Sequence, residues 1–126
     1  MPTLPWTVPN TPPPGTEIHV FASRFETRTF WGALRFLVRT PGVWRQVGRA
    51  PGAYGASLRA QPLRRTFWTL SAWESPDALR AFARSGTHVP ASRGLAPQMR
   101  DAQFAGWQTS SDDLPVSWAE AGRRLT

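Results

Sequence analysis

Apolar side chains alternate with polar ones, or gather in short runs, over four stretches of the chain, and each stretch predicts a β-strand. Residues 17–25 (EIHVFASRF) and 66–74 (TFWTLSAWE) are rich in β-branched and aromatic residues and contain no Gly or Pro. Residues 102–110 (AQFAGWQTS) also predict a strand, although they include Gly106. Residues 53–60 (AYGASLRA) give a weaker strand prediction, because Gly55 adds no side chain to the sheet.

Other stretches have the three-to-four-residue spacing of apolar side chains that is typical of helices. Residues 27–40 form one such run, and we expect Pro41 to break it and to open a second short helix over residues 41–50. Residues 75–86 predict the next helix, with Ser75 as its N-cap and proline at its first position.

The two ends of the chain differ in character. Residues 1–15 contain six of the 13 prolines, so we expect an irregular arm with Trp6 available as an anchor. Near the C-terminus, Ser117 and Glu120 have the spacing of a capping box, which predicts a short helix over residues 117–125. The expected domain organisation is therefore this arm, followed by one domain over residues 16–126 that ends in the short helix.

The order of the elements is strand, helix, strand, strand, helix, strand, which predicts an α+β fold of the ferredoxin-like βαββαβ type with an antiparallel sheet. Both faces of the expected strands are apolar. If Phe21, Phe25, Phe67 and Trp73 line a face without helices, a second copy of the chain must cover it. The pattern thus predicts a homodimer in which sheet packs on sheet, a dimeric α+β barrel.

Composition narrows the function further. The chain has 126 residues, a net charge of +7 and no cysteine, which excludes disulfides and thiolate chemistry. All 15 basic residues are arginines, and because they extend from Arg24 to Arg124 without one dense run, we expect nucleic acid to be an unlikely partner. No apolar run is long enough for a membrane span and no leader is visible, so no membrane partner and a cytoplasmic location are expected.

The stretch FWTLSAWESPDALRAFARSGTH, residues 67–88, resembles the strand–helix core of the antibiotic biosynthesis monooxygenase-like superfamily of dimeric α+β barrels. Residues 34–60 also resemble part of spheroidene-monooxygenase-like proteins. The resemblance covers roughly residues 17–110. It implies the fold above and a choice among cofactor-free oxygenases, haem-binding and haem-degrading enzymes, isomerases, dehydratases and proteins of no known activity.

The sequence departs from the pattern of the haem-degrading branch of this superfamily, and this departure disfavours haem degradation. Phe82 stands where the haem-degrading branch has a tryptophan in the helix, and Ser92 stands where it has the histidine ligand. Haem bound in another geometry stays open, with His88 or His19 as the axial ligand. No other metal site is expected, because two isolated histidines and no cysteine offer no zinc ligand set.

Aromatic residues make up 12% of the chain, which suits a pocket for a flat apolar ligand. We expect Trp31, Trp68 and Trp107 to line this pocket between helices and sheet as substrate-binding residues. Arg24 is the one charged residue on its strand face and is a candidate catalytic cation, although it could equally reach water at the end of the strand.

His88 lies just beyond the helix predicted for residues 75–86, beside Gly86 and Pro90. It is the candidate catalytic base at the pocket mouth, or else an exposed residue that ends the helix. His19 alternates onto the opposite strand face from Arg24, where we expect the dimer interface.

The sequence therefore predicts a small monooxygenase of secondary metabolism that acts on an aromatic or polyketide-like substrate without a cofactor. Two alternatives stay open. One is a haem-dependent enzyme of the same fold, and the other is a non-catalytic protein that binds a small molecule in the same pocket.

Overall fold

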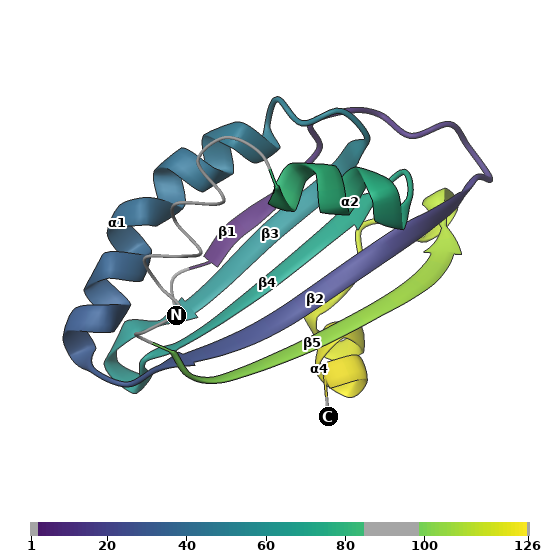
Figure 1. Ribbon diagram of the computed structural model, residues 1–126. Coiled ribbons are helices and arrows are strands. Elements are labelled where there is room, and N and C mark those ends of the chain that lie inside the picture. The colour runs from purple at the N-terminus through teal and green to yellow at the C-terminus, as the bar shows by residue number, and fades with distance from the viewer. Residues whose placement is uncertain (1–2, 85–98, 126) are drawn as a thin grey trace.

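The computed structural model describes residues 3–84 and 99–125, which form an antiparallel five-stranded sheet with helices on both sides (Figure 1). The sheet order is β1-β3-β4-β2-β5. Its strands are β1 (Thr3–Thr7), β2 (Glu17–Thr27), β3 (Ala53–Gln61), β4 (Thr66–Trp73) and β5 (Met99–Ser110). The helices are α1 (Phe30–Val47), α2 (Pro76–Ala83) and α4 (Trp118–Leu125), with short helical turns η1 (Pro62–Arg64) and η3 (Ser111–Asp113). The predicted ferredoxin-like α+β class is confirmed.

Helices α1 and α2 cover one face of the sheet, which we call the helix-facing side (Figure 1). Phe67 and Trp73 of β4 are buried there, Phe67 with Ala33 of α1 and Trp73 with Phe82 of α2. Burial of these large aromatic side chains fixes which face of β4 meets the helices, because a one-residue slip would turn every side chain to the other face.

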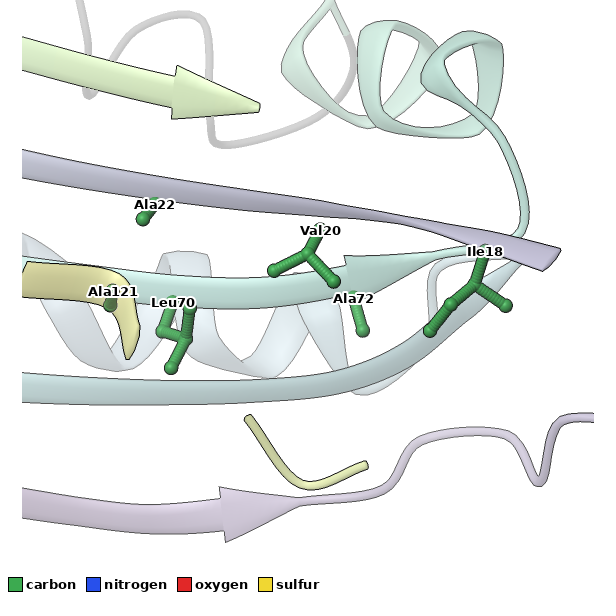
Figure 2. Close-up of a cluster of buried hydrophobic side chains, with 6 residues drawn as sticks. All are labelled: Ile18, Val20, Ala22, Leu70, Ala72 and Ala121. Carbon is green, nitrogen blue, oxygen red and sulfur yellow. The ribbon is translucent and has the colours of Figure 1, made fainter. Parts of the chain in front are cut away.

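The opposite face of the sheet, the second face, has its own small core (Figure 2). Its buried members come from β2, β4 and α4, and they are Ile18, Val20, Ala22, Leu70, Ala72 and Ala121. The apolar side of helix α4 packs on these residues and so covers one half of the second face. The sheet is therefore covered by helices of the same chain on one side and partly covered by α4 on the other.

The predicted caps of the later helices are confirmed. The Ser75 hydroxyl accepts a hydrogen bond from the Ala78 amide at 3.2 Å, with proline in the first turn of α2. The Ser117 hydroxyl accepts one from the Glu120 amide at 3.1 Å at the start of α4. Each bond satisfies an amide that has no partner within the helix, so the two helix starts are fixed locally.

The predicted break at Pro41 is wrong, because α1 continues through this residue. Proline inside a helix removes one backbone hydrogen bond and costs about 3 kcal/mol. The helix is held to the sheet on both sides of the proline, by Ala33 before it and by Trp44 and Val47 after it. Tertiary packing thus outweighs the local signal.

The prediction of an irregular arm over residues 1–15 is wrong for Thr3–Thr7, which pair with β3 as an edge strand. Pro5 is tolerated because an edge strand uses its backbone donors on one side only. The Trp6 ring lies against Gly55, where a Cβ atom would be 2.0 Å from the ring. Glycine at position 55 is thus required by the packing of Trp6.

The prediction that Phe21, Phe25, Phe67 and Trp73 line a face open to a second copy is also wrong. All four lie on the helix-facing side, and Phe67 and Trp73 are fully buried under the chain's own helices. The alternation of apolar residues along a strand shows which residues share a face, but it does not show which face the helices cover. A charge at Phe67 or Trp73 would therefore disrupt the monomer rather than a dimer.

Candidate functional site

A group of aromatic and hydroxyl side chains occupies the helix-facing side where β2, β4 and β5 run side by side. We call this group the aromatic floor. Strand pairing sets its rows, because His19 is opposite Trp73, Phe21 is opposite Ser71, and Ser23 is opposite both Thr69 and Phe104. Its members are His19, Phe21, Ser23, Phe25, Thr69, Ser71, Trp73 and Phe104.

Three phenylalanines form the apolar part of the floor. Phe104 stacks on Phe21 with ring centroids 5.9 Å apart, and it meets Phe25 edge-on at 5.6 Å. Phe104 is nevertheless 60% exposed, whereas Phe21 and Phe25 are half-buried. An exposed phenylalanine held by two ring contacts offers a flat apolar surface to a planar ligand.

Hydroxyl groups lie between the aromatic rings. The hydroxyls of Ser23 and Thr69 are hydrogen-bonded to each other across the β2–β4 pair. The Trp73 indole donates to the Ser71 hydroxyl at 2.8 Å. The Ser71 hydroxyl in turn donates to the Phe21 carbonyl at 3.5 Å. These contacts hold the side chains in place and leave a lone pair on the Ser71 oxygen that can accept from a ligand hydroxyl, since a hydroxyl oxygen has two lone pairs.

His19 lies at one end of the floor, on β2. Burial, and then the positive charge of Arg80 on α2, lower the pKa of His19 below its ordinary value. The imidazole is therefore mostly neutral at neutral pH, which is the form that accepts a proton. No local pattern in the sequence favours this histidine, because Arg80 is remote from it in the chain.

Gly106 of β5 makes room for the imidazole. A Cβ atom at Gly106 would lie 3.1 Å from His19 Cε1 and 3.3 Å from His19 Nε2. The glycine faces the same side of the sheet as Phe21, its pairing partner on β2. The absence of a side chain at position 106 thus determines where the imidazole can lie.

We expect Gly106→Val to displace the His19 ring while leaving the strand paired. Valine suits a β-strand but fills the space that the imidazole occupies. The His19 ring resonances should shift in an NMR spectrum, and the ligand affinity of the floor should fall. Unchanged His19 resonances in a folded Gly106→Val protein would show that the ring does not depend on this glycine.

A cleft of about 880 Å³ lies on the same side of the molecule, between α1 and α2. Arg45 and Gln46 line it from α1, Arg49 lines it from the turn that follows α1, and Asp77 and Phe82 line it from α2. Phe82 also packs on Trp73, with ring centroids 5.2 Å apart. This aromatic pair therefore connects the cleft to the His19 end of the aromatic floor.

The tryptophans predicted to line one pocket are not brought together. Trp31 begins α1 and is 74% exposed. Trp68 and Trp107 lie on the second face, where Trp107 packs on the small core beneath the Arg124 guanidinium. The sheet thus separates Trp68 and Trp107 from α1 and α2. His88 lies outside the described residues.

Arg24 also lies on the second face, opposite Trp68 in the β2–β4 pair. Its guanidinium is 3.6 Å from an Asp101 oxygen and 3.9 Å from a Glu26 oxygen. Arg24 is therefore on the side of the sheet opposite to the aromatic floor. The cation beside the floor is Arg80 of α2, which sequence reasoning did not select; its guanidinium is itself 3.0 Å from an Asp77 oxygen.

His19 is the residue that the sequence placed wrongly. It alternates with Phe21, Ser23 and Phe25 and was predicted to lie at a dimer interface, whereas the structure places it on the helix-facing side.

Within the described residues, no three His, Asp or Glu side chains come together as metal ligands would. Across residues 3–84 and 99–125, no helix is long and apolar enough to cross a bilayer.

The fold is that of antibiotic biosynthesis monooxygenase-like proteins, as the sequence resemblance implied. No protein-family model matches the chain, and no curated protein matches it. Its likeness to known proteins is therefore one of structure.

One similar solved structure is SnoaB from Streptomyces nogalater, described as a cofactor-independent oxygenase, with a TM-score of 0.62 and 18% identity over 80% of this chain and 100% of that one. A protein of Nitrosomonas europaea, assigned provisionally as an antibiotic biosynthesis monooxygenase, has a TM-score of 0.63 and 15% identity over 82% of this chain and 96% of that one. A Caulobacter crescentus protein with the same provisional assignment has a TM-score of 0.58 and 18% identity over 76% of this chain and 90% of that one.

Proposed function

We propose that the chain is a small monooxygenase that oxidises an aromatic, polyketide-like substrate without a cofactor, and that the aromatic floor is its site. The observation that carries the proposal is a neutral, half-buried imidazole at the end of an exposed aromatic surface. The structural likeness to a cofactor-independent oxygenase supports it.

In the proposed reaction the substrate supplies the electrons for oxygen. His19 takes a proton from a phenol or from an activated ring carbon, and the resulting anion passes one electron to O₂. The carbon radical and superoxide then combine into a peroxide. For a ring CH₂ group, loss of water from this peroxide leaves a carbonyl, so one oxygen atom enters the product and the other leaves as water.

The other residues of the floor have supporting roles in this proposal. Phe21, Phe25 and Phe104 bind the planar rings, and the Ser71 oxygen can accept from a substrate hydroxyl. Arg80 favours both the neutral imidazole before proton transfer and the substrate anion after it, because a positive charge disfavours a second one nearby and stabilises a negative one.

The acid limb of the pH–rate profile should lie below the ordinary histidine value of about 6.5. A lowered pKa keeps His19 unprotonated, and thus active as a base, further into the acid range. The same shift stabilises the fold above that value and loses this contribution as the pH falls, because the unfolded chain then binds the proton more readily. An NMR titration of the His19 ring checks the pKa, and a value above 6.5 would contradict this account.

Oxygen uptake by the purified chain tests the proposed activity. Polycyclic phenols are offered as substrates, with a chelator present and the visible spectrum recorded beforehand. We expect uptake and product formation from a protein that absorbs no visible light. A Soret band, with activity that follows it, would assign the site to haem. Tight binding of the phenols without oxygen uptake would leave a small-molecule binding protein.

We also propose that the chain forms a homodimer through the open half of the second face. This half carries Trp68 together with the charged residues Arg24, Glu26 and Asp101, each of which is half-buried or exposed. Neighbouring positive and negative groups can pair with themselves across a two-fold axis.

Sedimentation velocity tests the homodimer. The wild-type chain should sediment as a dimer, and Asp101→Arg should shift it toward the 14.0 kDa monomer by removing the negative partner. A wild-type monomer at micromolar concentration would refute the proposal.

A further inference from the structure

The charge of the chain is concentrated in one segment. Between Glu26 and Glu74 there is no acidic residue, and eight of the 15 arginines fall in this segment. The other seven arginines share the rest of the chain with all eight carboxylates. The eight are Arg28, Arg35, Arg39, Arg45, Arg49, Arg59, Arg64 and Arg65. The excess positive charge therefore belongs to α1 and to the β3–β4 region.

The fold brings two parts of this segment together at one end of the molecule. The start of α1 lies beside η1, the connection between β3 and β4 (Figure 1). The Arg65 guanidinium donates to the Arg28 carbonyl at 3.0 Å, and the Thr27 amide donates to the Arg65 carbonyl at 2.9 Å. The two basic segments thus form one continuous surface.

Large apolar side chains are exposed on both of these segments. Trp31 and Val38 are 74% and 79% exposed, and Leu63 of η1 is 88% exposed. Trp31, Arg35 and Val38 follow a spacing of four and three residues, which places them on one face of α1. We call this surface the basic apolar edge; its residues are Arg28, Trp31, Arg35, Val38, Leu63 and Arg64.

We propose that the basic apolar edge docks the protein on an anionic lipid surface. The arginines of this edge attract lipid phosphates, and each contributes favourable binding free energy near a charged bilayer. Tryptophan favours the level of the headgroups, and an exposed leucine or valine can enter the acyl boundary. This surface is separate from the aromatic floor, so the inference goes beyond the proposed enzymatic function and does not depend on it.

A lipid surface explains the edge better than other anionic partners. Nucleic acid would contact the arginines but would gain little from Val38 and Leu63, which point into solvent. An acidic protein would need a shaped contact, whereas Trp31 and Leu63 protrude from a helix and a turn. A fluid interface accepts protruding side chains without a preformed partner shape.

Co-sedimentation with vesicles tests the proposal. The wild-type chain should bind vesicles of equal parts phosphatidylcholine and phosphatidylglycerol, bind pure phosphatidylcholine weakly, and lose binding as salt is added. The double variant Arg35→Gln/Arg64→Gln should bind the anionic vesicles roughly 30-fold more weakly, from about a tenfold loss per 1.4 kcal/mol and about 1 kcal/mol for each arginine. Leu63→Ser should weaken binding without a change in charge.

The matched control is Arg100→Gln/Arg123→Gln, which removes the same charge from exposed positions outside the edge. It should retain most of the binding. An equal loss in both double variants would overturn the proposal, because net charge alone would then explain it. An absence of vesicle binding at low salt would also overturn the proposal. The same holds if RNA or an acidic polypeptide binds in place of vesicles and this binding requires the residues of the basic apolar edge. Circular dichroism confirms that each variant is folded.

Discussion

His19→Ala should lower the turnover of a phenolic substrate by about 100-fold or more, because a positioned base typically contributes that much to proton transfer. The substitution removes the imidazole at one end of the aromatic floor and leaves the phenylalanines that are proposed to bind the substrate rings. Substrate affinity should therefore change far less than turnover. Oxygen uptake gives the rate, and a fluorescence titration gives the affinity.

Two comparisons make this result specific. Arg24→Gln removes a cation from the second face, and we expect turnover to stay close to that of the wild type. His88→Ala tests the histidine that the sequence favoured. Loss of turnover in His88→Ala together with full activity in His19→Ala would refute the role proposed for His19.

Phe67→Ala should lower the free energy of unfolding by about 3–5 kcal/mol, the usual cost of emptying a large aromatic site in a core. Phe67 is 0% exposed, and it packs between β3, β4 and α1 with Ala33, Leu58 and Ala60. The two alanines have no side-chain atoms that can move into the space that the ring leaves. Urea denaturation measures the loss.

Phe104→Ala is the matched control, because it makes the same chemical change on the same side of the sheet. Phe104 is 60% exposed and is held by two ring contacts, so the expected loss is about 1 kcal/mol. The same variant should weaken binding of a planar phenol. Equal losses of stability in the two variants would contradict the placement of Phe67 under α1.

The strands and most helix starts could be predicted because their signals are local. Alternation marked β2 and β4, and the Ser75 hydroxyl and the proline after it marked α2. The course of α1 through Pro41 could not be read locally, because contacts with the sheet hold the helix together across this residue. The strand β1 was missed for a similar reason, since its proline is tolerated only at a sheet edge.

The candidate site was less predictable than the fold. Alternation grouped His19 with Phe21, Ser23 and Phe25, but it could not tell which face the helices would cover. Arg24 and Trp68 lie on the other face of the sheet, because they alternate along β2 and β4 with residues of the helix-facing side. The pKa of His19 is lowered by burial and then by Arg80 of α2, an element more than fifty residues away in the chain. Such a pairing has no local signal in the sequence.

An NMR titration of the protein with a planar phenol tests whether the aromatic floor is the binding site. The largest shifts should fall on Phe21, Phe104 and the His19 ring, with smaller changes at Arg24 and Trp68. Phe104→Ala should reduce the shifts. Shifts centred on Arg24 and Trp68, with His19 and Phe104 unmoved, would place the ligand on the second face and refute the proposed site.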